Sequence, residues 1–260
     1  MDTVRLMVVL PSLGERLDSL ELALDSCLSL PAWVTATVVV VIPHQAMEAR
    51  DIAMRRGAVL IDDPGLGMAG AINSAISTRS DERYYIWLGD DDVLVGPGIG
   101  RAVERLQMSP RAVVAFGHCE YINEMGTVIG TNAAGYLAAL LLPWGPNLIP
   151  HPGTVVSLDA LEEAGGFSPE LSYALDLDMF LKLRKLGQFL SVRAVTAQFR
   201  WHADSLTVAD RRASSREAMK VKASHLPALI RPLALLWQWP VAWASALAAR
   251  AVTWVARKKR

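Results

Sequence analysis

Features that mark several protein classes are scarce in this sequence of 260 residues. Two cysteines, Cys27 and Cys119, are too few for a disulfide framework or a cysteine-based zinc site, and they favour a reducing compartment. Positive charge is not in excess, because 26 Lys and Arg balance 26 Asp and Glu. A dedicated nucleic-acid binder usually carries a basic surplus, so we expect no nucleic-acid partner. Charged residues make up 20% and hydrophobic residues 52%, which excludes a disordered chain.

Common targeting and ligand motifs are also missing. The opening apolar run is interrupted by Arg5 and ends at Pro11, which is unlike a secretory signal. No Gly-Lys-Ser/Thr sequence is present for a P-loop, and the glycines of 65–73 lack the spacing of a dinucleotide site. Because those glycines precede an expected helix, they are a weak candidate for a phosphate cradle.

Short apolar segments alternate with helical patterns over the first two-thirds of the chain. We expect strands at 5–10, 36–42, 59–61, 84–88 and 113–117, and helices at 18–28, 47–56, 69–78 and 100–107. Later segments predict a hairpin at 121–129, a strand at 154–157, a helix within 168–187, a closing strand at 188–199 and a polar helix at 211–225. Apolar strands alternating with helices are typical of an α/β fold whose parallel sheet is covered on both faces. In such sheets ligands bind at the carboxyl ends of the strands.

The C-terminal segment, 211–260, differs in character from the rest. Its only acidic residue is Glu217, residues 233–249 carry no charge, and several Trp residues precede a closing run of Arg and Lys. Trp and cationic side chains both favour a membrane interface, so we expect a basic, Trp-rich helical tail that associates with a membrane. Lying in the interface is favoured over crossing it, because 233–249 is short and contains Pro240. The alternative is a hydrophobic helix docked on the protein's own core.

An acidic triplet, Asp90-Asp91-Asp92, directly follows the apolar segment 84–88. Three adjacent carboxylates repel one another unless a cation offsets them. Carboxylate oxygens suit Mg²⁺ or Mn²⁺, which in turn neutralise a diphosphate. The alternative is a solvated acidic turn or a helix cap.

Two further groups are candidates for chemistry. Asp176 and Asp178 stand near the start of the helix expected within 168–187, where one of them is a candidate general base. Equally, both acids simply favour a helix N-terminus electrostatically. His202 follows the closing strand and His151 lies in a tight Pro-Gly loop; a single His is more often an ordinary structural residue than a ligand.

In their order along the chain, these motifs resemble the inverting, family-2-type nucleotide-sugar glycosyltransferases of the GT-A fold. The likeness extends from about Val4 to Thr207, and the ordered series is more specific than any single motif. The segments that carry it are Val8-Val9-Leu10-Pro11-Ser12, Asp63-Pro64-Gly65, Gly67 to Asn73, Asp90-Asp91-Asp92, His151-Pro152-Gly153-Thr154, Gly165-Gly166-Phe167, Asp176 to Leu183 and Arg200-Trp201-His202.

The resemblance implies roles for individual residues. Nucleotide-sugar contacts are implied for Pro11, Ser12, Asp63, Gly67, Asn73, Asp90 and Asp91. A divalent cation, Mg²⁺ or Mn²⁺, is implied on Asp92, with Asp91 and His202 supporting it or the phosphates. Asp176 would be the catalytic base, and His151 and Asp178 would lie on the acceptor side.

The sequence departs from the family's pattern at several positions. Residues 42–44 read Ile-Pro-His, where the family usually has aspartates that hold the nucleotide base. Gly89, Gly70 and Leu175 stand where polar or acidic residues are common. Since Asp92 and Asp176 are both present, we expect an active enzyme with unusual donor selection.

The expected organisation is a GT-A-like domain over 1–210 and the tail over 211–260. Residues 1–118 would bind the nucleotide-sugar, and 119–210 would form the acceptor and catalytic half. We expect a metal-dependent inverting glycosyltransferase that acts on a lipid-linked or cell-envelope glycan at the cytoplasmic face of the cell membrane. A metal-dependent nucleotidyltransferase and a non-catalytic nucleotide-sugar-binding scaffold are the alternatives.

Overall fold

The computed structural model describes residues 3–201, 211–227, 229 and 231. Its nine strands form one sheet, in the order β3-β2-β1-β4-β8-β6-β9-β5, with β7 paired to β6. The strands are β1 (Val4–Pro11), β2 (Val34–Ile42), β3 (Val59–Asp62), β4 (Tyr84–Trp87), β5 (Val93–Leu94), β6 (Ala112–Ile122), β7 (Val128–Asn132), β8 (Val155–Ser157) and β9 (Gln188–Arg200). The helices are α1 (Leu17–Leu28), α2 (Met47–Arg55), α3 (Gly67–Ile76), α4 (Gly96–Gln107), α5 (Tyr136–Leu141), α6 (Leu158–Glu163), α7 (Leu175–Leu183) and α9 (Arg211–His225).

Most strands of the sheet run in one direction. β1 pairs parallel with β2 and β4, and β2 pairs parallel with β3. β8 is antiparallel to both β4 and β6, and β9 is parallel to β6. The direction is therefore shared by β1, β2, β3, β4, β6 and β9, and the predicted mostly parallel sheet is confirmed. The predicted boundary between residues 118 and 119 falls within β6, so one continuous strand joins the two predicted halves.

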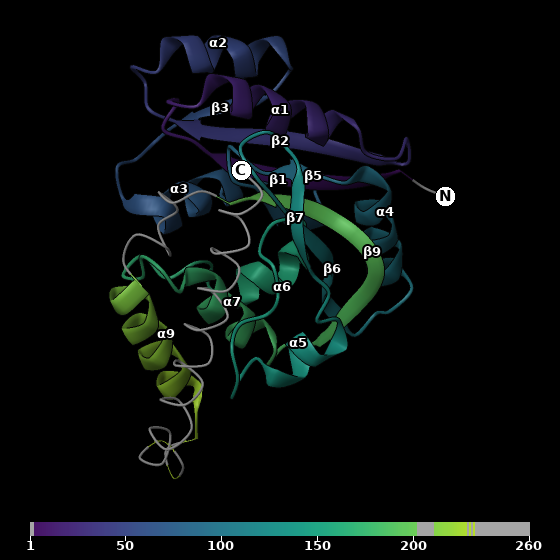
Figure 1. Ribbon diagram of the computed structural model, residues 1–260, viewed down its shortest axis with the longest axis vertical. Coiled ribbons are helices and arrows are strands. Elements are labelled where there is room, and N and C mark those ends of the chain that lie inside the picture. The colour runs from purple at the N-terminus through teal and green to yellow at the C-terminus, as the bar shows by residue number, and fades with distance from the viewer. Residues whose placement is uncertain (1–2, 202–210, 228, 230, 232–260) are drawn as a thin grey trace.

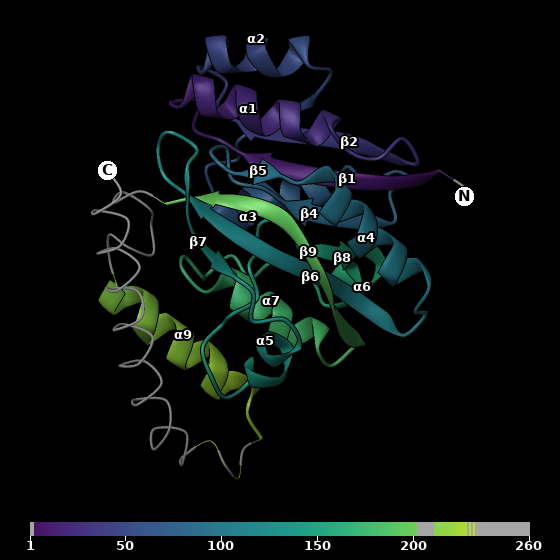
Figure 2. The same cartoon turned by 45° about the vertical axis from the view of Figure 1, so that its right-hand side comes forward.

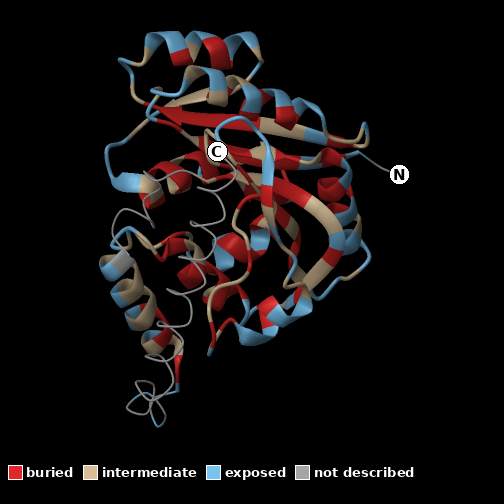
Figure 3. Ribbon diagram, viewed as in Figure 1, coloured by how far each residue is buried: buried red, intermediate tan, exposed pale blue. Residues whose placement is uncertain are grey.

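Helices cover both faces of the sheet, as predicted (Figures 1 and 2). Along β1, Leu6 and Val8 enter a core formed with α1, α2 and α4, whereas Met7 and Val9 enter a second core. That second core is formed with α3, α5, α6, α7 and α9. Successive strand side chains point to opposite faces, and both faces are buried (Figure 3). This double burial is the reason that β1 is almost continuously apolar.

Element boundaries differ from the expected ranges at a few places. β6 extends to Ile122 because its second half pairs with both β7 and β9. α4 begins at Gly96, four residues early, with Pro97 in its first turn, where proline is favoured. Its Gly98 packs so closely on β9 that a Cβ atom would lie 1.8 Å from the Val195 carbonyl oxygen.

The C-terminal helix α9 spans Arg211–His225, as predicted. The membrane-associating segment expected after it lies outside the described residues, apart from its first few positions. Among the residues that the structure describes, no helix has the length and hydropathy needed to cross a bilayer.

Candidate active site

One cavity of about 720 Å³ opens at the carboxyl ends of β1 and β4. It brings together most of the residues singled out in the sequence: Pro11, Ser12, Asp63, Gly67, Asp90, Asp91, Asp92, His151 and Asp176. These residues come from both predicted halves of the chain. The acidic triplet and the helix-borne Asp176 therefore face a common space. His202 lies outside the described residues, and Asn73 and Asp178 do not line the cavity.

The first two aspartates of the triplet are tied to the loop that follows β1. Ser12 Oγ donates a hydrogen bond of 2.6 Å to Asp90 Oδ2, and Arg16 Nη1 lies 2.6 Å from Asp91 Oδ2 and 3.5 Å from Asp90 Oδ1. Because β1 and β4 are adjacent parallel strands, the loops at their carboxyl ends meet. Burial raises the pKa of Asp90, and the neighbouring charge of Asp91 raises it further. The hydrogen bond from Ser12 and the positive charge of Arg16 oppose the rise.

Asp92, the third aspartate, is almost fully enclosed, with 1% of its surface exposed. Its Oδ1 accepts a hydrogen bond of 3.0 Å from the backbone N–H of Arg200. Burial raises the pKa of Asp92 to about 8, the charges of Asp91 and Asp90 add to the rise, and the Arg200 hydrogen bond opposes it. With this pKa the Asp92 carboxyl is mostly protonated at pH 7, and a bound cation would favour its ionised form.

The residue before the triplet leaves space beside these carboxylates. A Cβ atom on Gly89 would lie 2.8 Å from Asp92 Oδ2 and 3.1 Å from Asp91 Oδ1. A larger residue here would press on both groups. The departure from the family pattern at this position therefore has a local steric reason: the carboxylates of Asp91 and Asp92 lie too close for a side chain.

Asp176 occupies the first turn of α7 and lines the same cavity. Its Oδ2 accepts a hydrogen bond of 3.0 Å from Asn147 Nδ2, and its Oδ1 accepts one of 2.7 Å from the Leu177 N–H. Burial raises the pKa of Asp176 to about 6, although these hydrogen bonds oppose the rise. A carboxylate with a pKa just below neutral is ionised at pH 7 and suited to act as a general base.

Aromatic rings form the cavity wall between the triplet and Asp176. The His151 ring stacks on Trp87, with centroids 4.2 Å apart and planes 32° apart, and also contacts Phe199. Burial lowers the pKa of His151 to about 4, against the opposing charge of Asp91. The imidazole is therefore neutral at pH 7 and behaves as part of an aromatic surface, the type of surface on which a sugar or nucleotide ring packs.

Two residues with predicted site roles have structural partners instead. Asn73 donates to the Phe167 carbonyl (2.8 Å) and accepts from the Phe167 N–H (2.9 Å), which ties α3 to the loop before α7. Asp178 accepts hydrogen bonds from Ser168 (2.6 Å) and His225 (2.8 Å) and forms an ion pair with Lys182 (2.9 Å).

Sequence reasoning missed several residues that shape the site. Arg16 lies in the loop after β1, four residues beyond Ser12, where no motif was recognised. Arg200 belongs to the Arg200-Trp201-His202 segment but was given no role of its own, and its guanidinium binds the carbonyls of Asp91, Asn123 and Glu124. Asn147 lies in a segment without periodicity, so no sequence signal identifies it as the partner of Asp176.

No family model matches the sequence, and no curated protein matches it. Solved structures do match. The mannosyltransferase PcManGT of Pyrobaculum calidifontis, solved with GDP-Man and Mn²⁺, has a TM-score of 0.67 at 18% identity, over 96% of this chain and 76% of that chain. S. aureus TarS 1–349 has a TM-score of 0.63 at 13% identity, over 89% and 69%. Its complex with UDP-GlcNAc has a TM-score of 0.62 at 13% identity, over 89% and 70%. At these identities the likeness shows the fold: this chain has a glycosyltransferase-like α/β fold.

Proposed function

We propose that this protein is a metal-dependent inverting glycosyltransferase, which moves a sugar from a nucleotide-diphospho-sugar to an acceptor hydroxyl. The observation that carries the proposal is the shared cavity, in which Asp90, Asp91 and Asp92 face Asp176. One wall gathers acidic oxygen ligands and the other holds a carboxylate whose pKa is raised to about 6. The similar fold of a mannosyltransferase solved with GDP-Man and Mn²⁺ supports it.

The donor would lie along the ends of β1 and β4, in contact with Pro11, Ser12, Asp63 and Gly67. Ser12 and Arg16 hold Asp90 and Asp91 in place there. Because residues 42–44 supply no carboxylate for a nucleotide base, the base would be recognised by backbone groups and by Asp63. This is the physical basis for the unusual donor selection that we expect.

The acidic triplet fits a divalent cation in the kind of ligand it offers. Mg²⁺ is commonly held by one or two carboxylates together with substrate phosphates rather than by a complete protein cage. The described residues contain no cluster of three or more His, Cys, Asp or Glu arranged as ligands, so substrate phosphates would have to complete the coordination. Asp91 and Asp92 would hold Mg²⁺ or Mn²⁺, with His202 as a further candidate. When bound, the cation supplies positive charge that stabilises the leaving diphosphate.

Asp176 would accept the proton of the acceptor hydroxyl as that oxygen attacks the sugar carbon. Asn147 orients the carboxylate through its hydrogen bond to Oδ2. A single displacement of this kind inverts the configuration at the sugar carbon and needs one base, whereas a retaining reaction uses a second carboxylate as nucleophile. His151, neutral and stacked on Trp87, would pack against the sugar or the acceptor.

The acceptor would be a lipid-linked or cell-envelope glycan at the cytoplasmic face of the membrane. The short helix α5 exposes Tyr136 (65%), Leu137 (60%) and Leu140 (51%), and Trp144 follows at 45%. This apolar surface precedes Asn147 in the chain by only a few residues. Exposed Tyr, Trp and Leu side chains favour the membrane interface, as does the basic, Trp-rich segment 211–260.

The decisive experiment is a screen of nucleotide sugars with Mn²⁺ by thermal shift, because a ligand that binds only the folded state raises the melting temperature. Donors that stabilise the protein are then tested for transfer of radiolabelled sugar to lipid extracts. Transfer with inversion supports the proposal. Release of pyrophosphate without sugar transfer would favour a nucleotidyltransferase. Asp92→Ala and Asp176→Ala variants that still bind the donor and leave the protein's function in cells unchanged would favour a scaffold.

A further inference from the structure

Helix α9 packs against the helix that carries Asp176. It lies beside α7 in both views (Figures 1 and 2). Val221 is buried in the same core as Leu175 and Leu177, and Ala218 packs against that core. The positions 218, 221 and 225 recur at the spacing of one helical face. α9 is thus an integral part of the layer that holds the predicted base.

The first turn of α7 lacks a capping side chain of its own. Its N-cap residue is Ala174, which makes no side-chain cap, and alanine is among the poorest residues at this position. A helix N-terminus leaves backbone N–H groups without partners inside the helix. Asp176 itself binds one of them, the Leu177 N–H, and the backbone that enters the helix is held from elsewhere in the fold.

Glu217 of α9 supplies an acceptor for the segment that leads into α7, residues 172–174, the last of which is the N-cap. Its Oε1 accepts hydrogen bonds from the N–H groups of Tyr173 and Ala174, both at 2.7 Å, and of Ser172 at 3.1 Å. Its Oε2 lies 3.2 Å from the Ser172 nitrogen. Charge-assisted hydrogen bonds of this kind are stronger than neutral ones, and a negative charge is favourable at a helix N-terminus. Glu217 is the single acid of the segment 211–260.

Two further contacts from α9 surround the same place. His225 pairs with Asp178, two residues after Asp176, at 2.8 Å. The buried Lys222 donates to the carbonyl oxygen of Gly145, two residues before the Asn147 that binds Asp176. α9 therefore contacts the chain on both sides of the Asp176–Asn147 pair.

We propose that Glu217 is a positioning residue for sugar transfer, which fixes the first turn of α7 and thereby the direction of the Asp176 carboxylate. This inference rests on the proposed function. Glu217 does not line the cavity, so it acts through the segment 172–174, of which Ser172 and Tyr173 do line it, and through α7 behind that segment. A displacement of about 1 Å of a catalytic group can lower a rate by about 100-fold, so an anchor on the three consecutive N–H groups that lead into α7 controls a distance on which the reaction depends.

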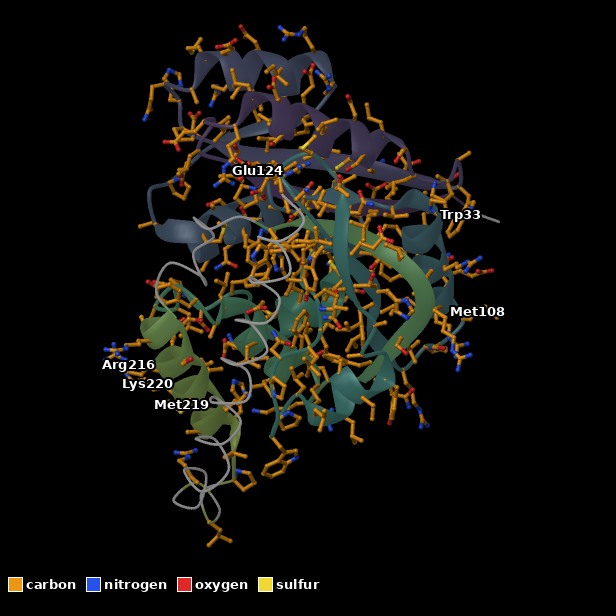
Figure 4. All side chains as sticks on the ribbon, viewed as in Figure 1. Trp33, Met108, Glu124, Arg216, Met219 and Lys220 are labelled. Atoms are coloured by element: carbon orange, nitrogen blue, oxygen red, sulfur yellow. The ribbon has the colours of Figure 1, made fainter. Side chains whose placement is uncertain are left out.

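The test compares full-length variants Glu217→Ala, Glu217→Gln and Lys220→Ala. Lys220 is the matched control, because it projects from the outer face of the same helix (Figure 4). We expect E217A to lower kcat by about 10- to 100-fold while the dissociation constant of the donor stays unchanged, since Ser12, Asp63 and Asp90 are untouched. E217Q keeps a carbonyl acceptor and is expected to recover most of the lost rate, and K220A to match the wild type.

Amide hydrogen exchange provides a second readout without any substrate. In E217A the amides of Ser172, Tyr173 and Ala174 should exchange faster, whereas the β1 and β4 amides stay protected. An active wild type together with an equally active, folded E217A would overturn the positioning role alone. If E217A is unfolded, E217Q decides through both readouts: a kcat that falls as the amides of residues 172–174 exchange faster supports the role, and faster exchange at those amides with a wild-type kcat contradicts it. A wild type that transfers no sugar from any nucleotide donor would refute the proposed function, and the positioning role with it.

Discussion

Asn147 and Asp176 form a hydrogen-bonded pair, 3.0 Å from Nδ2 to Oδ2, inside the cavity that also contains the acidic triplet. Asn147 comes from the irregular segment between α5 and β8, and Asp176 from the first turn of α7. The amide fixes one carboxylate oxygen and the Leu177 N–H fixes the other. The carboxylate therefore has a defined direction before any substrate binds.

Replacing Asp176 by Asn should remove the general base while keeping the shape of the side chain. We expect sugar transfer to fall by about 10²- to 10⁴-fold, with donor binding retained. In the wild type, transfer requires the ionised carboxylate, whose pKa is about 6. The value of kcat/KM should therefore be constant at neutral pH and decline as the pH falls through about 6. Steady-state kinetics between pH 5 and 8 measure this, and a D176N enzyme with wild-type kcat would contradict the assignment.

Asn147→Ala should change the pH profile in a predictable direction. The hydrogen bond from Asn147 opposes the burial that raises the pKa of Asp176. Without it the pKa should rise further, so the acidic limb of kcat/KM should move to higher pH. Asn132→Ala is a matched control, because Asn132 also lines the cavity but binds the Leu148 carbonyl. A limb that moves to lower pH in N147A would argue against this role.

Removal of divalent cations should abolish transfer, because the carboxylates of the triplet lose the charge that would hold a diphosphate near them. Activity measured after EDTA treatment should return on addition of Mn²⁺ or Mg²⁺. Asp91→Asn is expected to raise the cation concentration needed for half-maximal activity. Full activity in excess chelator would show that the triplet has another purpose.

Asp178→Asn should destabilise the fold rather than alter donor recognition. Burial alone would raise the pKa of Asp178, but the hydrogen bonds from His225, Lys182 and Ser168 outweigh it and hold the pKa well below its usual range. The stabilisation is present above the unfolded pKa, near 4, and is lost as the pH falls below it. Breaking a buried pair costs about 3 kcal/mol. Urea unfolding should therefore give D178N a lower free energy of unfolding than the wild type at pH 7, and the difference should shrink towards pH 3. An equal deficit at both pH values would contradict the ion-pair explanation.

Asn73→Ala tests whether Asn73 contacts the nucleotide or only the chain. Its side chain bonds both backbone groups of Phe167, and unpaired polar groups cost about 1–3 kcal/mol. We expect lower thermal stability and an unchanged donor dissociation constant. If the donor affinity falls while the melting temperature stays constant, Asn73 contacts the nucleotide-sugar, as the family resemblance implies.

The alternation of apolar strands and helical patterns was sufficient to predict the architecture, because strand and helix periods are local properties of the sequence. β1 is an example: its unbroken apolar run requires burial on both faces, and the structure shows both. The acidic triplet was equally visible, since three carboxylates directly after such a strand are costly without a partner.

Only the tertiary structure decided which residues meet in the cavity. Asn147, Arg16 and Glu217 lie in segments without a recognisable motif, and their partners are 29, 75 and 43 to 45 residues away in the chain. Asn73 and Asp178 carry residue types suited to ligand binding, yet packing directs both towards protein partners. Local periodicity determines the elements, whereas side-chain contacts depend on how those elements pack, and that information is spread over the whole chain.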